Sequence, residues 1–161
     1  MQSPLDDERL TLAGLFFEAH AGLSVALERR LDAECGLTVS SFEVLLRLAR
    51  SDDERLRMSD LASQVTLSAS GLTRAVDRLV EHRLVRRDSC PSDGRVLYAA
   101  LTPKGRKRIE AAARVHLTHL DEVFTGLLDD DQRAALACAL RILRDKLNPG
   151  ATAAEPSDSD R

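Results

Sequence analysis

Residues 58–102 restrict the possible folds more than any other part of the chain. They predict two short helices, 58–65 and 69–83, joined by a turn at 66–68 and followed by two strands with a polar tip between them. Apolar side chains of the second helix recur at a spacing that places them on one side. These are Leu72, Ala75, Val76, Leu79 and Val80, and the other side carries Ser70, Thr73, Arg74, Asp77, Arg78 and Glu81. Two such helices followed by a β-hairpin form a winged helix.

The polar side of the second helix carries groups that bind nucleic acids, because guanidinium and hydroxyl groups hydrogen-bond to phosphates and base edges. Residues 74–108 contain 10 Lys and Arg against 4 Asp and Glu, a net charge of +6, although the whole chain carries -3. The residues before and after this stretch carry -5 and -4. A basic stripe between acidic flanks is typical of phosphate binding, and a solvated helix face with spare arginines is the alternative.

Four further helices are predicted around the winged helix, at about 10–31, 41–49, 103–127 and 129–147, so the fold class is mainly α. Gly36 is expected to end the first of them in the left-handed conformation. Ser40 with Glu43, and Asp129 with Gln132, are expected to form capping boxes. Residues 51–57 are expected to be a polar connection.

The outer helices are apolar over more than one face, and a winged helix of about 60 residues folds without them. Their simplest role is to form a homodimer, whose two-fold symmetry matches a pseudo-palindromic DNA site. We expect one domain at 1–148, with a winged-helix core at 41–102, dimerisation helices at 10–34 and 103–147, and a disordered tail at 149–161. A monomer with a helical cap is the alternative.

The length of 161 residues suits one domain with its own core. There is no uninterrupted run of about 18 apolar residues, and the acidic N-terminus lacks the pattern of a signal peptide. Three cysteines, Cys35, Cys90 and Cys138, fit reduced thiols better than a disulfide framework. The chain is therefore expected to be cytoplasmic, with no membrane partner.

The recognition helix and the wing carry motifs that resemble those of one family. The first region reads SASGLTR at 68–74, VDRL at 76–79 and LVRR at 84–87, and the wing reads DGR at 93–95 followed by LT at 101–102 and Gly105. Together they resemble the MarR family of winged helix-turn-helix transcriptional regulators, over residues 10–147. The resemblance implies a homodimeric DNA-binding protein, usually a repressor, which small ligands or oxidants release from DNA. The chain has Gly94 where the family often has Arg, and Thr66 and Arg83 where it often has Gly.

Eight residues are expected to contact double-stranded DNA: Ser68, Ser70, Thr73, Arg74, Arg78, Arg86, Arg87 and Arg95. Arg86 and Arg87 are expected to reach phosphates, which position a protein without reading sequence. The resemblance implies that Arg95 enters the minor groove and that Asp93 supports the wing, since the narrow groove attracts arginine.

Each of these roles has a structural alternative. Ser68 is equally well explained as a helix N-cap. Asp77 is able to form a surface pair with Arg74 or Arg78, and Arg95 to form a salt bridge within the hairpin.

A ligand pocket is predicted between the dimerisation helices and the winged helix. Its residues are Phe16, Phe17, His20, Arg47 and His116, and they suit a small aromatic acid effector. Core packing explains Phe16 as well.

No metal site or cofactor is predicted. His116 and His119, with Glu34, Cys35 or Glu43, form a weak candidate for zinc, because two histidines without clear further ligands are more often structural. Redox control through Cys90 or Cys35 is a second alternative, although residues 10–18 lack the cysteine that peroxide-sensing relatives carry near the start of the first helix.

The sequence predicts a DNA-binding regulator and not an enzyme. It contains no glycine-rich phosphate loop, no Ser/His/Asp spacing and no paired carboxylates in an apolar setting. A winged-helix module that binds another protein is the remaining alternative, and the operator, the effector and the sign of regulation stay open.

Overall fold

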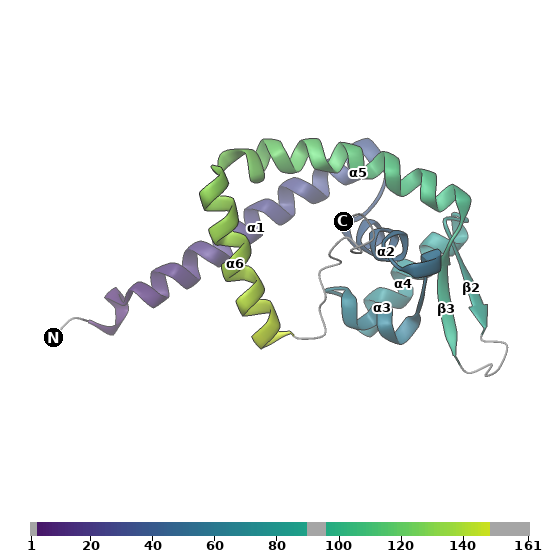
Figure 1. Ribbon diagram of the computed structural model, residues 1–161, viewed down its shortest axis with the longest axis horizontal. Coiled ribbons are helices and arrows are strands. Elements are labelled where there is room, and N and C mark those ends of the chain that lie inside the picture. The colour runs from purple at the N-terminus through teal and green to yellow at the C-terminus, as the bar shows by residue number, and fades with distance from the viewer. Residues whose placement is uncertain (1–2, 90–95, 149–161) are drawn as a thin grey trace.

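The computed structural model describes residues 3–89 and 96–148 of the chain, which form a mainly helical protein with a small sheet (Figure 1). The helices are α1 Glu8–Cys35, α2 Val39–Ala49, α3 Met58–Gln64, α4 Ala69–Glu81, α5 Pro103–Val123 and α6 Asp130–Leu147. The strands are β1 Arg55–Arg57, β2 Val85–Ser89 and β3 Leu97–Leu101, and the 3₁₀ turns are η1 Pro4–Asp6, η2 Asp52–Glu54 and η3 Thr125–Leu127. The predicted fold class, a winged helix with additional terminal helices, is confirmed. The predicted tail at 149–161 lies outside the described residues.

Helices α2 to α4 and the three strands make up the winged helix, which lies at one end of the molecule in Figure 1. The sheet is antiparallel in the order β1-β3-β2, with Val85 opposite Leu101 and Arg55 opposite Ala100. Strand β1 was not predicted, because residues 51–57 were expected to be a connection. Three residues are too few to show strand periodicity, and only the pairing with β3 defines them as a strand.

The core of the winged helix is closed within the single chain. Leu72, Val76 and Leu79 of α4 are at most 2% exposed, and Leu45 and Leu48 of α2 are fully buried. The polar side of α4 faces outward as predicted. Burial of whole leucine side chains at about 25 cal/mol per Å² is the main stabilising contribution here.

Two predicted helix ends are confirmed and one is wrong. Gly36 ends α1 at φ 55°, and the Asp129–Gln132 capping box opens α6. Helix α2 is capped by Thr38 and not by Ser40, because the helix begins two residues earlier than expected. The Thr38 hydroxyl accepts a bond from the Ser41 N–H (3.2 Å). Glu43 accepts bonds from the N–H and hydroxyl of Thr66 and so joins α2 to the turn after α3.

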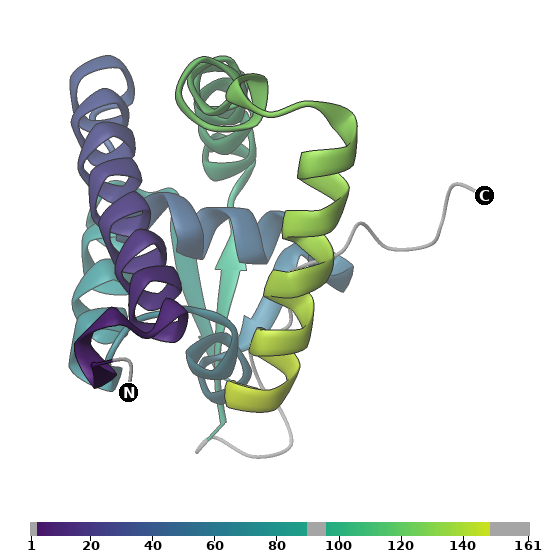
Figure 2. The same cartoon turned by 90° about the vertical axis from the view of Figure 1, so that its left-hand side faces the viewer.

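Helix α5 runs from the base of the wing back across α1 (Figure 1). The two helices are held together by packing and by an ion pair between Arg30 and Glu122 (2.7 Å). Helix α6 and the N-terminal half of α1 are not packed into the core. Figure 2 shows α1 on the left and α6 on the right, apart from each other, with α5 seen nearly end-on between their upper ends.

Helix α6 and the N-terminal half of α1 expose apolar side chains. No residue of α6 is buried, and Leu143 and Leu147 are 49% and 77% exposed. On α1, Leu12 and Phe17 are 70% and 66% exposed. By length and composition alone α1 is long and apolar enough to cross a membrane, although it contains no uninterrupted apolar run of about 18 residues. Core helices of soluble proteins and signal sequences meet the same criterion.

Candidate nucleic-acid interface

The exposed side of α4 presents the groups predicted to read DNA. Ser70, Thr73, Arg74 and Arg78 are all exposed, while Leu72, Ala75 and Val76 on the opposite side of the helix are buried. No described residue forms an ion pair with Arg74 or Arg78. Among residues 3–89 and 96–148, no ion pair engages either guanidinium group, and Arg forms a two-pronged bond with guanine or phosphate.

Two hydroxyl groups of this helix are engaged with the backbone. The Ser68 hydroxyl accepts a bond from the Gly71 N–H (3.1 Å), so Ser68 is an N-cap whether or not it also meets DNA. The Thr73 hydroxyl donates to the carbonyl oxygen of Ala69 (3.0 Å). In this rotamer Thr73 is able to accept a bond from a base amino group but not to donate one to a phosphate.

The arginines of β2 form ion pairs within the chain. Arg87 binds Asp77 (2.6 Å), which ties the wing to α4, and Arg86 binds Asp88 (3.0 Å). The alternative that Asp77 pairs with Arg74 or Arg78 is not what the structure shows, since Asp77 is paired with Arg87 of the adjacent strand β2. Exposed pairs of this kind contribute about 0–1 kcal/mol, so a phosphate competes for either arginine at little cost.

The base of the wing explains the L-T-x-x-G part of the wing motif. The Thr102 hydroxyl donates to the carbonyl oxygen of Arg83 (2.8 Å) and accepts from the Gly105 N–H (3.0 Å). A Cβ at Gly105 would lie 2.0 Å from the carbonyl oxygen of Leu84. Only glycine lets α5 start this close to the end of α4. The predicted roles of Cys90, Asp93 and Arg95 fall outside the described residues.

Strand β1 adds two arginines that the sequence did not single out. Arg55 lies over the ring of Tyr98 (4.0 Å from its centroid), and the Arg57 guanidinium donates to the Tyr98 hydroxyl (3.2 Å). The alternation of charged and apolar residues in Arg-Leu-Arg at 55–57 was the only local indication of a strand with two outward arginines. Both arginines lie outside the basic stretch of residues 74–108.

The residues predicted to line a ligand pocket form two groups in the single chain. Phe16 contacts Phe17 and stacks on His20 (centroids 5.5 and 6.5 Å apart), and all three are exposed on α1. His116 lies on α5 against Phe42 (4.6 Å), and burial lowers its pKa, with a further lowering by His119. Arg47 is on α2, where burial lowers its pKa. The α1 group and the other two residues therefore lie on different elements, α1 on one side and α2 and α5 on the other.

The described residues contain no group of three or more His, Cys, Asp and Glu side chains that would hold a metal ion. His116 and His119 each have a buried Nδ1 atom without a hydrogen-bond partner in the described part. Cys35 is buried, and this burial raises its pKa, which disfavours the reactive thiolate. Cys138 is exposed.

Known proteins share the fold of this chain and part of its sequence. The MarR family model matches residues 36–96. The structure of AbsC, a MarR family transcriptional regulator from Streptomyces coelicolor, superimposes with a TM-score of 0.83 at 32% identity, covering 92% of this chain and 99% of AbsC. Sco3205 from the same organism, solved in complex with DNA, superimposes with a TM-score of 0.84 at 29% identity, covering 99% of this chain and 96% of Sco3205.

A curated relative is YkoM of Bacillus subtilis (strain 168), an HTH-type transcriptional regulator that is 28% identical over 99 residues, 62% of this chain. The match spans 63% of YkoM, just under two thirds of its length. These relatives are transcriptional regulators and not enzymes, which agrees with the class predicted from the sequence. From its fold, its wing motif and these similarities, the chain belongs to the MarR family.

Proposed function

We propose that the protein is a cytoplasmic homodimeric repressor that binds a pseudo-palindromic DNA site and leaves it when a small ligand binds. The observation that carries the DNA-binding part is the exposed side of α4, where Arg74 and Arg78 have no ion-pair partner among the described residues. The relative Sco3205, which was solved in complex with DNA, has the same fold.

We propose that α4 makes the direct contacts with the bases. Arg74, Arg78, Ser70 and Thr73 face the major groove, and Ser68 holds the start of the helix while remaining close to the phosphates. Arg86 and Arg87 exchange their carboxylate partners for phosphates, and Arg95 enters the minor groove with Asp93 supporting the wing.

The homodimer is proposed because α1 and α6 have apolar faces that nothing in the single chain covers. A second copy is the simplest cover, since both faces lie on the part of the molecule away from the winged helix (Figure 1). Such a pair holds two copies of α4 about one turn of DNA apart, and half-site spacing follows from this geometry.

The proposed effector is a small aromatic acid. It is bound by Phe16, Phe17, His20, Arg47 and His116. In the single chain these residues are divided between α1 and the α2–α5 region. In the proposed dimer, one copy of the chain supplies the α1 group and the other copy supplies Arg47 and His116.

The DNA contacts are tested by fluorescence anisotropy on promoter fragments upstream of the protein's own gene, over a range of salt concentrations. The affinity is expected to fall steeply with salt, because several phosphates are neutralised by each chain. Arg74→Ala and Arg78→Ala are each expected to weaken binding by about 1–3 kcal/mol. Arg114→Ala, an exposed cation of α5 away from this surface, is the control and should bind as the wild type does.

If both α4 variants bind DNA with unchanged affinity, then α4 is not part of the DNA interface. No salt-dependent binding to any DNA would favour the alternative that the winged helix binds another protein. The dimer is tested separately by sedimentation: Leu15→Asp and Leu143→Asp, each placing a charge on an exposed apolar face, are expected to give folded monomers. A monomeric wild type at high concentration would contradict the dimer.

A further inference from the structure

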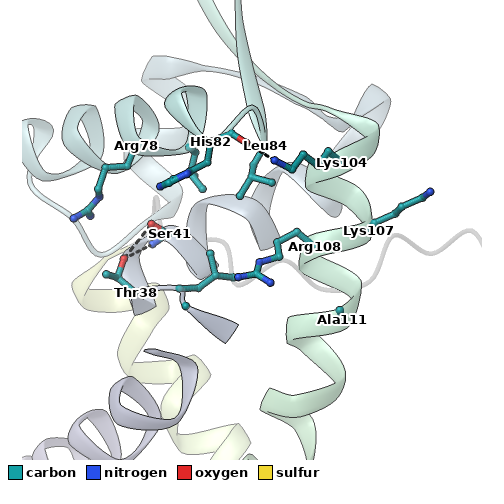
Figure 3. A pocket seen from close by; sticks show the side chains of 12 residues that line it. Thr38, Ser41, Arg78, His82, Leu84, Lys104, Lys107, Arg108 and Ala111 are labelled. Atoms are coloured by element: carbon teal, nitrogen blue, oxygen red, sulfur yellow. Dashed lines mark hydrogen bonds between the residues drawn. The ribbon is translucent and has the colours of Figure 1, made fainter. Parts of the chain in front are cut away.

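A cavity of about 530 Å³ lies where the end of α4, the start of α5 and the connection between α1 and α2 meet (Figure 3). Its volume falls within the usual range for small-molecule sites, about 300–1,000 Å³. It is separate from the predicted pocket of aromatic residues, with which it shares no lining residue.

The cavity is lined by cationic side chains and by no acidic one. The charges come from Arg78 of α4 and from Lys104, Lys107 and Arg108 of α5, and His82, the residue that follows α4, also lines the cavity. Figure 3 shows Lys104 and Arg108 extending toward α4, while Lys107 points away from it. So many cations without a carboxylate among the lining residues create a positive potential that an anion relieves.

The two inward cations keep donors to spare. Lys104 donates to the carbonyl oxygen of His82 (3.0 Å), and the Arg108 guanidinium donates to the carbonyl oxygen of Cys35. A lysine ammonium has three donors and an arginine guanidinium five. These backbone bonds therefore fix the position of both side chains at the cavity without using up their capacity for a ligand.

The floor of the cavity is apolar. Leu37, Leu79 and Leu84 line it, and each is at most 6% exposed. The hydroxyls of Thr38 and Ser41 are bonded to each other (3.0 Å). The site therefore combines a cationic rim with an apolar surface, which suits an organic molecule with one strongly charged end.

We propose that this cavity binds a small organic phosphomonoester, with its phosphate between Arg78, Lys104 and Arg108 and its organic part on the three leucines. A phosphate carries a charge of about -1.5 to -2 and accepts bonds from several cations, whereas a single carboxylate balances only one. A cavity of this volume has room for the organic part that free phosphate lacks.

The ligand also opposes DNA binding, and this second part rests on the proposed function. Arg78 belongs both to the outward side of α4 and to the cavity. A phosphomonoester in the cavity holds the Arg78 guanidinium away from the DNA and adds negative charge beside α4, so the bound protein has a lower affinity for its site.

Binding is tested first without DNA, by isothermal titration of the full chain in a phosphate-free buffer with phenyl phosphate, inorganic phosphate and benzoate. Phenyl phosphate is expected to bind more tightly than either of the other two. Lys104→Gln and Arg108→Gln are each expected to raise its dissociation constant about tenfold, since each removes a bond to a charged group. Arg114→Gln, on the same helix outside the cavity, is the control.

If Arg108→Gln unfolds because its bond to Cys35 is lost, Lys104→Gln still decides the result. Absence of phenyl phosphate binding overturns the proposal. Equal affinity for inorganic phosphate overturns the role of the leucine floor. Weaker DNA binding by the Lys104 variant without any ligand, with a shallower salt dependence, also overturns it, because the cavity would then hold a DNA phosphate.

The second step repeats the DNA titration in the presence of phenyl phosphate. The wild type is expected to lose affinity and Lys104→Gln to lose much less. Unchanged affinity in the wild type overturns the coupling while the site remains. If phenyl phosphate binds but the protein binds no DNA, the proposed function fails and the anion site stands.

Discussion

Helices α4 and α6 are both amphipathic, but only α4 meets a partner for its apolar side within the chain. Leu72 and Leu79 of α4 are 2% and 1% exposed, whereas no residue of α6 is buried. The same periodic pattern therefore has two different outcomes. In α4 it completes a core, and in α6 it leaves an apolar face for a second molecule to cover, which is the physical basis for proposing a dimer.

The contrast predicts different consequences for one kind of substitution. Leu45→Ala, in the closed core, is expected to lower the free energy of unfolding by about 2–5 kcal/mol, because it leaves a cavity among packed side chains. Leu143→Ala on α6 is expected to weaken self-association and to leave the helical circular dichroism of the chain nearly unchanged.

Chemical denaturation and sedimentation, carried out on both variants, separate the two effects. If Leu143→Ala leaves self-association as it is in the wild type, then α6 does not lie at the interface and the comparison fails for this helix.

The base of the wing and the exposed helix α1 also differ in whether a glycine can be replaced by alanine. Gly105→Ala is expected to cost about 1–3 kcal/mol, because its Cβ would collide with the backbone of Leu84 and the start of α5 would have to move. Gly14→Ala in α1 meets nothing within 4 Å and should stabilise the helix by about 1 kcal/mol. Thermal unfolding of both variants provides the measurement. A loss of stability in Gly14→Ala would show that a second copy packs closely against this part of α1.

Local chemistry in the sequence was enough to predict much of the winged helix. The spacing of Leu72, Val76 and Leu79 determined which side of α4 is buried, and the Asp129–Gln132 box located the start of α6. Such signals lie within one or two turns of the chain. Thr38 and Ser40 are both hydroxyl residues, however, and local sequence alone does not show which of them caps α2.

Features that depend on distant residues could not be predicted. Strand β1 exists because β3 pairs with it, and Asp77 binds Arg87 because β2 passes beside α4. The cavity at α4 and α5 takes its cations from residues 78–108, which the charge count had identified, but the count does not show that they surround a hollow. The predicted aromatic pocket rested on residue types alone, and its parts lie on separate elements of the single chain.

A smaller effect is expected at the end of α4. Arg83 has φ 59°, in the left-handed region that favours glycine, and glycine is the residue the family often has there. Arg83→Gly is therefore expected to raise the free energy of unfolding by about 0.5–1 kcal/mol. Gly36→Ala, at φ 55°, places a side chain in the same strained conformation and should change the stability in the opposite direction. Urea denaturation measures both, and equal signs would contradict the assignment of strain to these positions.

The smallest effect concerns His116, which lies on α5 against Phe42 of α2. Burial against Phe42 lowers the pKa of His116 from its ordinary value of 6.5, with a smaller contribution from His119. The unfolded chain therefore takes up this proton more readily than the folded one, so the contribution of His116 to stability is complete above about pH 6.5 and is lost as the pH falls below it. His116→Phe keeps a ring against Phe42 and removes the proton. The variant should lose less stability than the wild type between about pH 7.5 and about pH 5.5 in urea denaturation. His20→Phe, on the exposed half of α1, is the control, and an equal pH dependence in His116→Phe and the wild type would show that the His116 ring is not shielded from water in the folded protein.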